Sequence, residues 1–229
     1  MCGRFTLTHE ELLLEQQFEA ELMIHLLARY NIAPMQPITT VRYDIDTHKR
    51  KIDFAQWGLI PSWAKDPTMG SKMINARAES LREKPSFKGI FRHKRCLIPA
   101  SGFYEWESVG KKKVPHYIRM LDQSLFAFAG LWDTWHDPGG GQIDTVTIIT
   151  TEANDMLRRL HARMPIIVPQ HHYDRWLDPA NQTAKGLDDL LAPYPADEMQ
   201  HYAVSTAVNS VKTEGAQLIK PAGPSTLFG

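Results

Sequence analysis

The chain has 229 residues, of which 43% are hydrophobic, and its 26 lysines and arginines are matched by 26 aspartates and glutamates. These values are typical of a globular protein and exclude a disordered chain, a collagen-like chain and a bulk polycation. At this length the chain can bury a core without metals or disulfides.

The first third of the chain has a long helical pattern followed by a strand pair. Apolar residues recur at helical spacing over residues 8–30, and a capping box that starts at Thr8 predicts where the helix begins. Prolines end this pattern, and the segments 38–43 and 51–57 predict two strands of a hairpin. A proline-containing loop then leads to a short predicted helix over residues 76–81.

Strands dominate the rest of the chain. Four segments between residues 96 and 129 predict an antiparallel meander, and strands alternate with short helices after it. In chain order these are strands 96–99, 102–107, 116–120 and 125–129, strand 145–151, helix 153–160, strand 165–168, helices 170–177 and 185–191, and strand 202–204. We predict one α+β domain over residues 1–222, with a mainly antiparallel sheet curled like a barrel and flanking helices, and a tail over 223–229.

Cys2 has the most distinctive chemistry in the sequence. Removal of Met1, which a small second residue permits, leaves Cys2 with an amine and a thiol two carbons apart, with ordinary pKa values of about 8 and about 8.5. An aldehyde condenses with such an amine to a Schiff base, and the thiolate then closes a thiazolidine ring. Two other interpretations stay open: Cys2 is an ordinary small residue of a strand, or it is the nucleophile of an N-terminal amide hydrolase.

Eight short segments form an ordered set that extends from Cys2 to about Lys220, nearly the whole chain. The segments are Met1–Phe5, Tyr30–Pro34, Trp57–Pro61, Ile74–Glu79, Cys96–Trp106, Phe128–Trp132, Leu160–Pro165 and Val204–Asn209. Together they resemble the SRAP family, the SOS response-associated peptidases. The resemblance implies a DNA-damage protein that shields abasic sites in single-stranded DNA, with Cys2 bound to the open-chain sugar aldehyde as a covalent thiazolidine crosslink.

The resemblance implies three further catalytic residues. Asn75 would hold the sugar or the reacting amine, Glu105 would move protons between amine and sugar, and His161 would protonate the sugar oxygen. Strand alternation places Glu105 on the same face as Phe103, and a carboxylate among aromatic residues has a raised pKa unless it is partnered. Each residue also has a structural alternative, in which Asn75 caps a helix, Glu105 faces water at a sheet edge and His161 has no catalytic role.

Six cationic or aromatic side chains are expected to contact DNA: Arg4, Arg77, Arg163, Trp63, Phe87 and Trp106. The arginines each lie within two residues of a predicted catalytic position, and their forked donors suit phosphates. The aromatic residues are expected to stack on bases or to separate a duplex beside the lesion. The expected partner is single-stranded DNA with an abasic site, including one at a junction with duplex.

Other classes of site and function are limited by the same sequence. The ten histidines have no metal-ligand spacing, so we expect no metal and no other cofactor. The sequence has no apolar run of membrane length and no signal peptide, and Cys2 and Cys96 are its only cysteines. We therefore expect a cytoplasmic protein without a membrane partner, associated with the nucleoid if bacterial. We also expect a monomer. The alternatives are a self-processing N-terminal-nucleophile protease, a lyase-type activity, and a single-strand binding module without chemistry.

Overall fold

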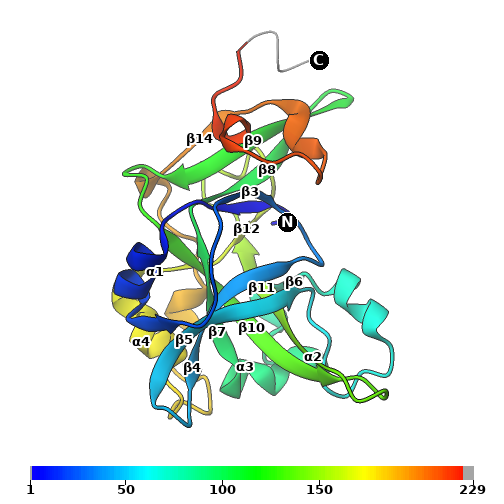
Figure 1. Ribbon diagram of the computed structural model, residues 1–229. Helices are drawn as coiled ribbons and strands as arrows, with labels where there is room; N and C mark the ends of the chain where they lie inside the picture. Colours follow the sequence, from blue (N-terminus) through cyan, green and yellow to red (C-terminus); the bar gives the residue numbers. More distant parts are fainter. Residues whose placement is uncertain (1, 224–229) are drawn as a thin grey trace.

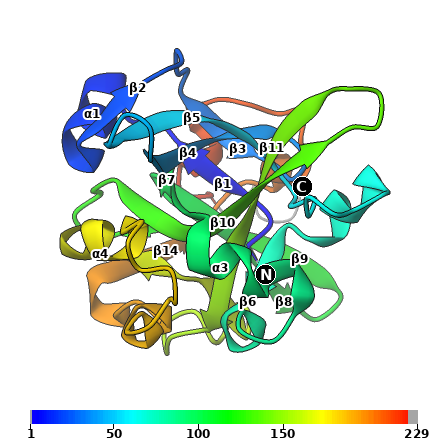
Figure 2. The same cartoon turned by 90° about the horizontal axis from the view of Figure 1, so that it is seen from below.

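Five strands form a closed ring at the centre of the molecule. In the computed structural model, which describes residues 2–223, the strands pair in the order β11–β10–β7–β4–β5, and β5 pairs in turn with β11 (Figures 1 and 2). These strands are β4 (Pro37–Asp44), β5 (Lys49–Trp57), β7 (Arg95–Ala100), β10 (Phe126–His136) and β11 (Gln142–Glu152). All pairs are antiparallel except the parallel seam between β5 and β11. Closure in this way leaves the ring without a free edge.

Four short strands attach to this ring, and two of them bring site segments to β11. The strands are β2 (Ala20–Leu22), β6 (Asn75–Arg77), β12 (Arg163–Pro165) and β13 (Ile167–Val168). β2 pairs with β5 and β13 pairs with β10, whereas β6 and β12 both pair with β11. Thr150 of β11 lies opposite Arg77 on one side and Pro165 on the other. Two segments nearly 90 residues apart in sequence therefore meet at one strand.

A second, five-stranded antiparallel sheet holds the N-terminal strand in its interior. Its order is β14–β9–β8–β1–β3, with β1 (Phe5–Leu7), β3 (Arg29–Ile32), β8 (Gly102–Val109), β9 (Lys112–Met120) and β14 (Met199–Ala203). The helices are short: α1 (Glu11–Phe18), α2 (Pro85–Lys88), α3 (Ile90–His93) and α4 (Tyr173–Leu177). No helix among residues 2–223 is long and apolar enough to cross a membrane.

Aromatic packing joins the two sheets. The ring of Phe128 on β10 lies edge-on to Phe5 of β1 at 5.7 Å and to Phe103 of β8 at 5.9 Å, measured between ring centroids. Phe5 also makes an edge-on contact with Trp57 of β5 at 5.3 Å. All four rings are almost completely buried, and each such side chain contributes about 1.5–3 kcal/mol by its removal from water. The core thus fixes β1 and β8 against the ring of strands.

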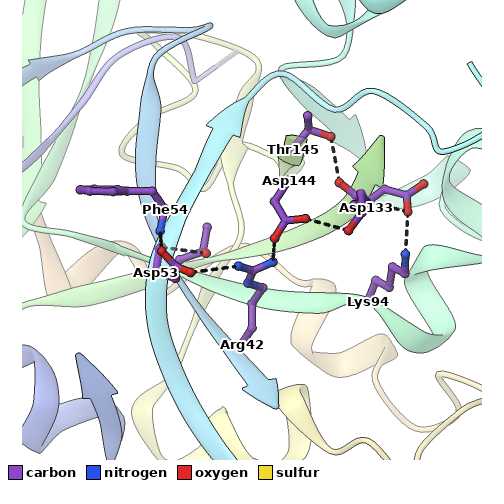
Figure 3. Close-up of polar contacts among 9 residues, drawn as sticks. Arg42, Asp53, Phe54, Lys94, Asp133, Asp144 and Thr145 are labelled. Atoms are coloured by element: carbon purple, nitrogen blue, oxygen red, sulfur yellow. Dashed lines mark hydrogen bonds and ion pairs between the residues drawn. The ribbon is translucent and has the colours of Figure 1, made fainter. Parts of the chain in front are cut away.

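A polar network ties strands of the ring together near its seam (Figure 3). Arg42 on β4 donates from Nη1 to Oδ2 of Asp144 on β11 at 2.6 Å, and its Nη2 lies 3.9 Å from Oδ2 of Asp53 on β5. Lys94, next to α3, forms a 2.7 Å ion pair with the buried Asp133 on β10. The charges at this end of the molecule are therefore compensated within the protein.

The structure confirms the α+β class and the mainly antiparallel, barrel-like sheet. It also confirms the hairpin of β4 and β5, the strand over 145–151 within β11, the four strands between residues 96 and 129, and the last strand. The single meander is wrong: β8 and β9 pair in one sheet, whereas β7 and β10 pair with each other in the ring. Most of the predicted tail, residues 224–229, lies outside the described part of the chain.

One predicted helix is much shorter in the structure and two are replaced by a strand or by turns. The helix predicted over 8–30 is limited to α1, which is followed by Glu19 in a left-handed conformation with φ 47°. The N-cap residue Glu10 makes no side-chain hydrogen bond to the helix. The rest of the predicted helix forms β2, which pairs with β5, and β3, which pairs with β1. The helix over 76–81 is the strand β6 followed by one 3-10 turn. The helix over 153–160 is a series of turns, in which Asn154 Oδ1 accepts from the Leu157 amide.

Candidate functional site

Cys2 lies three residues before the first residue of β1 and is completely buried. The pairing of β1 with β8 continues toward the N-terminus, because the Tyr104 amide donates to the Arg4 carbonyl at 2.9 Å. Continuation of the same register puts Gly3 opposite Glu105. Burial and the charge of Glu105 both raise the pKa of the Cys2 thiol well above its usual range. At neutral pH this thiol therefore carries its proton, and an acidic side chain lies near it.

Asn75 holds the backbone of Cys2 from the opposite side. Its Nδ2 donates to the Cys2 carbonyl at 2.8 Å, across 73 residues of sequence. The pairing of β6 with β11, in which Asn75 lies opposite Ile148, fixes the position of this amide. Asn75 is thus a strand residue that contacts Cys2, and the helix-capping alternative does not apply.

Glu105 is a buried carboxyl group in the middle of β8. Its side chain is 4% exposed, so the alternative of a water-facing carboxylate at a sheet edge is wrong. On the neighbouring strand it lies opposite His116. Its charge acts on the Cys2 thiol, so this carboxyl group lies within electrostatic range of the sulfur.

His161 lies in the segment that leads into β12. The Arg163 amide donates to its Nδ1 at 2.9 Å, so Nδ1 is the acceptor in the neutral ring and Nε2 carries the proton. The side chain of Arg163 donates to the Thr150 carbonyl at 2.6 Å and forms a two-pronged ion pair with Glu79 at 2.6 and 3.0 Å. Arg77, at the exposed end of β6, also lies opposite Thr150. The structure thus brings Arg77 and Arg163 to one strand of the ring.

Arg4 is held from within the protein. Its Nη1 donates to Asn31 Oδ1 at 2.6 Å and to the Val208 carbonyl at 2.8 Å, and its guanidinium lies 5.9 Å from the centre of the Trp106 ring. Trp106 is half-buried and donates to Asn209 at 2.8 Å. The C-terminal segment is therefore fastened beside the N-terminal strand.

The other two predicted aromatic contacts differ in their exposure. Trp63 lies in the loop after β5 and is 58% exposed, so its ring can stack on a ligand. Phe87 lies on α2 with only 5% of its surface exposed, within the core. Its ring is used in packing and has no free face for a base, so we remove Phe87 from the expected DNA contacts.

Three buried polar atoms of predicted site residues have no hydrogen-bond partner among residues 2–223. These atoms are Arg4 Nε, Asn75 Oδ1 and Arg163 Nε. Buried polar atoms in proteins are nearly always paired, and an unpaired one costs about 1–3 kcal/mol. Phosphate or sugar oxygens can accept from the two arginines, and a hydroxyl or amine can donate to Asn75. The site is therefore suited to a ligand rich in oxygen and negative charge.

Sequence analysis missed two groups of residues around this site. Asn31, completely buried, joins Arg4 to the carbonyls of Ser210 and Thr213. The second group lies around His116, on the same face of the sheet as Glu105. Nε2 of His116 lies 3.2 Å from Oε2 of Glu107, and its Nδ1 lies 3.1 Å from Nδ1 of His201. Position within the Tyr30–Pro34 segment is the one signal that could have identified Asn31.

Comparisons with known proteins find similar sequences and a similar fold. The model of the family described as SOS response associated peptidase (SRAP) matches residues 1–211. The abasic site processing protein YoqW of Bacillus subtilis is 46% identical over 226 residues, which cover 96% of this chain and 99% of that protein. The abasic site processing protein YedK of Escherichia coli is 30% identical, with 96% of this chain and all of that protein covered. A crystal structure of a Bacteroides thetaiotaomicron protein superposes with a TM-score of 0.87 at 25% identity, over 96% of this chain and all of that one.

Proposed function

The chain belongs to the SRAP family, and from this premise we propose that it shields abasic sites in single-stranded DNA by a covalent bond to Cys2. The two relatives compared above are named abasic site processing proteins. The observation that carries the proposal is the convergence of Asn75 and Glu105 on Cys2, from strands far apart in sequence. An abasic sugar in its open form presents the aldehyde that an N-terminal aminothiol captures.

The crosslink forms in two steps with loss of one water molecule. After removal of Met1, the Cys2 amine adds to the aldehyde carbon, and the resulting hydroxyl leaves as water to give a Schiff base. The sulfur then adds to the same carbon, and the thiol proton is passed to the nitrogen. Because the raised pKa of the thiol keeps it protonated, a proton acceptor is required, and we assign this role to Glu105.

The remaining residues position the reactants. Asn75 fixes the Cys2 carbonyl and offers Oδ1 to the amine or to a sugar hydroxyl. His161 donates from Nε2 to the sugar oxygen as the ring opens. Arg77, Arg163 and the free Nε of Arg4 bind flanking phosphates.

A single strand is the preferred substrate in this proposal. The lesion there is already unstacked, which avoids the few kcal/mol needed to extrude a nucleotide from a duplex. Trp63 and Trp106 stack on neighbouring bases, and Trp63 is exposed enough to meet the first base pair at a junction with duplex.

A denaturing gel with a labelled strand that contains one abasic site tests the proposal. We expect a slow band for the wild-type protein that survives denaturant, and no such band for C2A or for an intact strand. A binding module without chemistry gives no band with either strand. If C2S instead cleaves peptides while the wild-type protein leaves the abasic strand unmodified, the protein is an N-terminal-nucleophile peptidase and the proposal is wrong.

A further inference from the structure

The guanidinium of Arg163 is already occupied by an anion from its own chain. Glu79 lies in the 3-10 turn after β6, and its two carboxylate oxygens accept from Nη1 and Nη2 of Arg163 at 2.6 and 3.0 Å. This is the forked geometry in which arginine also binds a phosphate. The carboxylate of Glu79 thus takes the place that a DNA phosphate would take on Arg163.

The exposure of the pair indicates from which side a phosphate would approach. The side chain of Glu79 is 54% exposed, whereas that of Arg163 is 16% exposed. Glu79 therefore covers the face of Arg163 that is directed toward solvent. The second anchor of Arg163, its 2.6 Å bond to the Thr150 carbonyl, is independent of Glu79 and keeps the guanidinium in place when Glu79 leaves.

Glu79 is also influenced by the second cation of the site. A hydrogen bond from Arg163, with the charges of Arg163 and Arg77, lowers the pKa of Glu79 against the opposing effect of partial burial. Glu79 therefore stays ionised over the neutral range, between two arginines that we assign to phosphates.

We propose that Glu79 is a built-in competitor for the DNA phosphate on Arg163. The inference rests on the proposed function, because it takes Arg163 as a DNA contact. Intact single strands must displace Glu79 and are held weakly, whereas an abasic strand is retained by its covalent bond to Cys2. Selection for the lesion is thereby assigned to the chemical step and not to affinity for the backbone.

Binding of E79Q to an intact, fluorescently labelled oligothymidylate tests the inference. Glutamine keeps the shape of glutamate and removes its charge. We expect about three- to tenfold tighter binding than wild type at moderate salt, because the phosphate then meets no competing carboxylate on Arg163. E79A should change binding in the same direction, which guards against a defect particular to glutamine.

The matched control is D189N. Asp189 forms an equally forked pair with Arg175 of α4, at 2.5 and 2.7 Å, and α4 lies far from β6 in both views (Figures 1 and 2). D189N changes the net charge by the same amount as E79Q. Because Asp189 lies away from Arg163, D189N should bind the intact strand as wild type does. An equal gain in D189N overturns the inference, because the effect is then one of total charge.

Unchanged or weaker binding by E79Q and E79A also overturns the inference, because Glu79 then supports Arg163 instead of blocking it. The same holds if neither wild type nor E79Q binds the intact strand. The proposed function is tested separately by the gel with the abasic strand and wild-type protein. A missing crosslink together with tighter binding by E79Q would refute the covalent function and leave the competitor in place.

Discussion

Two arginines, Arg95 in the framework and Arg163 in the site, differ in how fully the protein satisfies their hydrogen-bond donors. Arg95 at the start of β7 is 6% exposed, and its guanidinium donates five hydrogen bonds to backbone carbonyls. Arg163 beside the site keeps a buried Nε without an acceptor among residues 2–223, and its other donors hold Glu79 and Thr150. All five donors of Arg95 are satisfied internally, whereas Arg163 retains capacity for a ligand.

The same difference separates the two regions to which these arginines belong. Around Arg95, the last turn of α3, the end of α4 and residues 178–181 are tied together because their carbonyls accept from this one side chain. Around Cys2, Asn75 and Arg4 each have one atom bonded to the protein and another buried and unpaired. We infer that internal hydrogen bonding is complete at Arg95 and incomplete at the residues around Cys2.

Replacement of Arg95 should give the largest loss of stability. R95M removes five hydrogen bonds from buried or half-buried carbonyls, and we expect the free energy of unfolding to fall by about 3–5 kcal/mol. Urea unfolding followed by circular dichroism measures this change. R158M is the control, because Arg158 is 65% exposed in a long ion pair and its loss should change stability by less than about 0.5 kcal/mol. A loss below about 1 kcal/mol for R95M would remove the distinction.

Replacement of Asn75 should instead affect rate more than stability. N75A removes the 2.8 Å bond to the Cys2 carbonyl, and a misplacement of the reacting group by about 1 Å costs about 10²-fold in rate. Time courses of crosslinking to an abasic strand measure the effect. N181A is the control, since the side chain of the half-buried Asn181 bonds only to Lys185 and Thr183 nearby in sequence. Wild-type rates in N75A would show that the amide is structural.

Replacement of Arg163 tests whether this arginine binds a DNA phosphate. R163Q should weaken binding to an intact strand several-fold and make the salt dependence of log K shallower by about 0.7. R175Q removes an arginine with a similar carboxylate pair on α4 and should leave both quantities unchanged. Equal losses in the two variants would mean that binding follows net charge alone.

Acidification should have the smallest effect on stability. It acts on the hydrogen-bonded group of His116, Glu107 and His201 beside the site. His116 Nε2 lies 3.2 Å from Glu107 and its Nδ1 lies 3.1 Å from Nδ1 of His201, so a neutral His116 that donates to the carboxylate accepts from His201. Burial lowers the pKa of both histidines, and the charge of His201 lowers that of His116 further. The unfolded state therefore binds more protons below about pH 6.5, and stability should fall as the pH falls below that value.

Thermal unfolding between pH 7.5 and 5.5 measures this dependence. H116Q should show a smaller fall than wild type over the same range, with the remainder due to groups such as His9, whose pKa burial also lowers. An identical fall in both proteins would show that the pair does not contribute.

Sequence predicts the parts of this fold that depend on neighbouring residues. The β4–β5 and β8–β9 hairpins follow from alternation and short turns, because their strands pair locally. Residues 20–32 have helical spacing, yet pairing of β2 with β5 and of β3 with β1 overrides it. No local signal indicates such distant partners.

The site follows the same rule. Cys2 can be identified from its own chemistry, and Asn75, Glu105 and His161 from the resemblance, whereas the contacts that hold them require the fold. Glu79 stands in the same segment as Asn75, but its importance depends on Arg163, 84 residues away. Phe87 is predicted from the sequence to contact DNA, whereas the structure buries it in the core.

The most direct test of the central claim is the intact mass of the protein under denaturing conditions, after incubation with a single strand that contains one abasic site. The account predicts the mass of the chain without Met1 plus the DNA minus one water, and no adduct for C2A. Absence of the adduct in a protein shown to lack Met1, or an equal adduct in C2A, would contradict it.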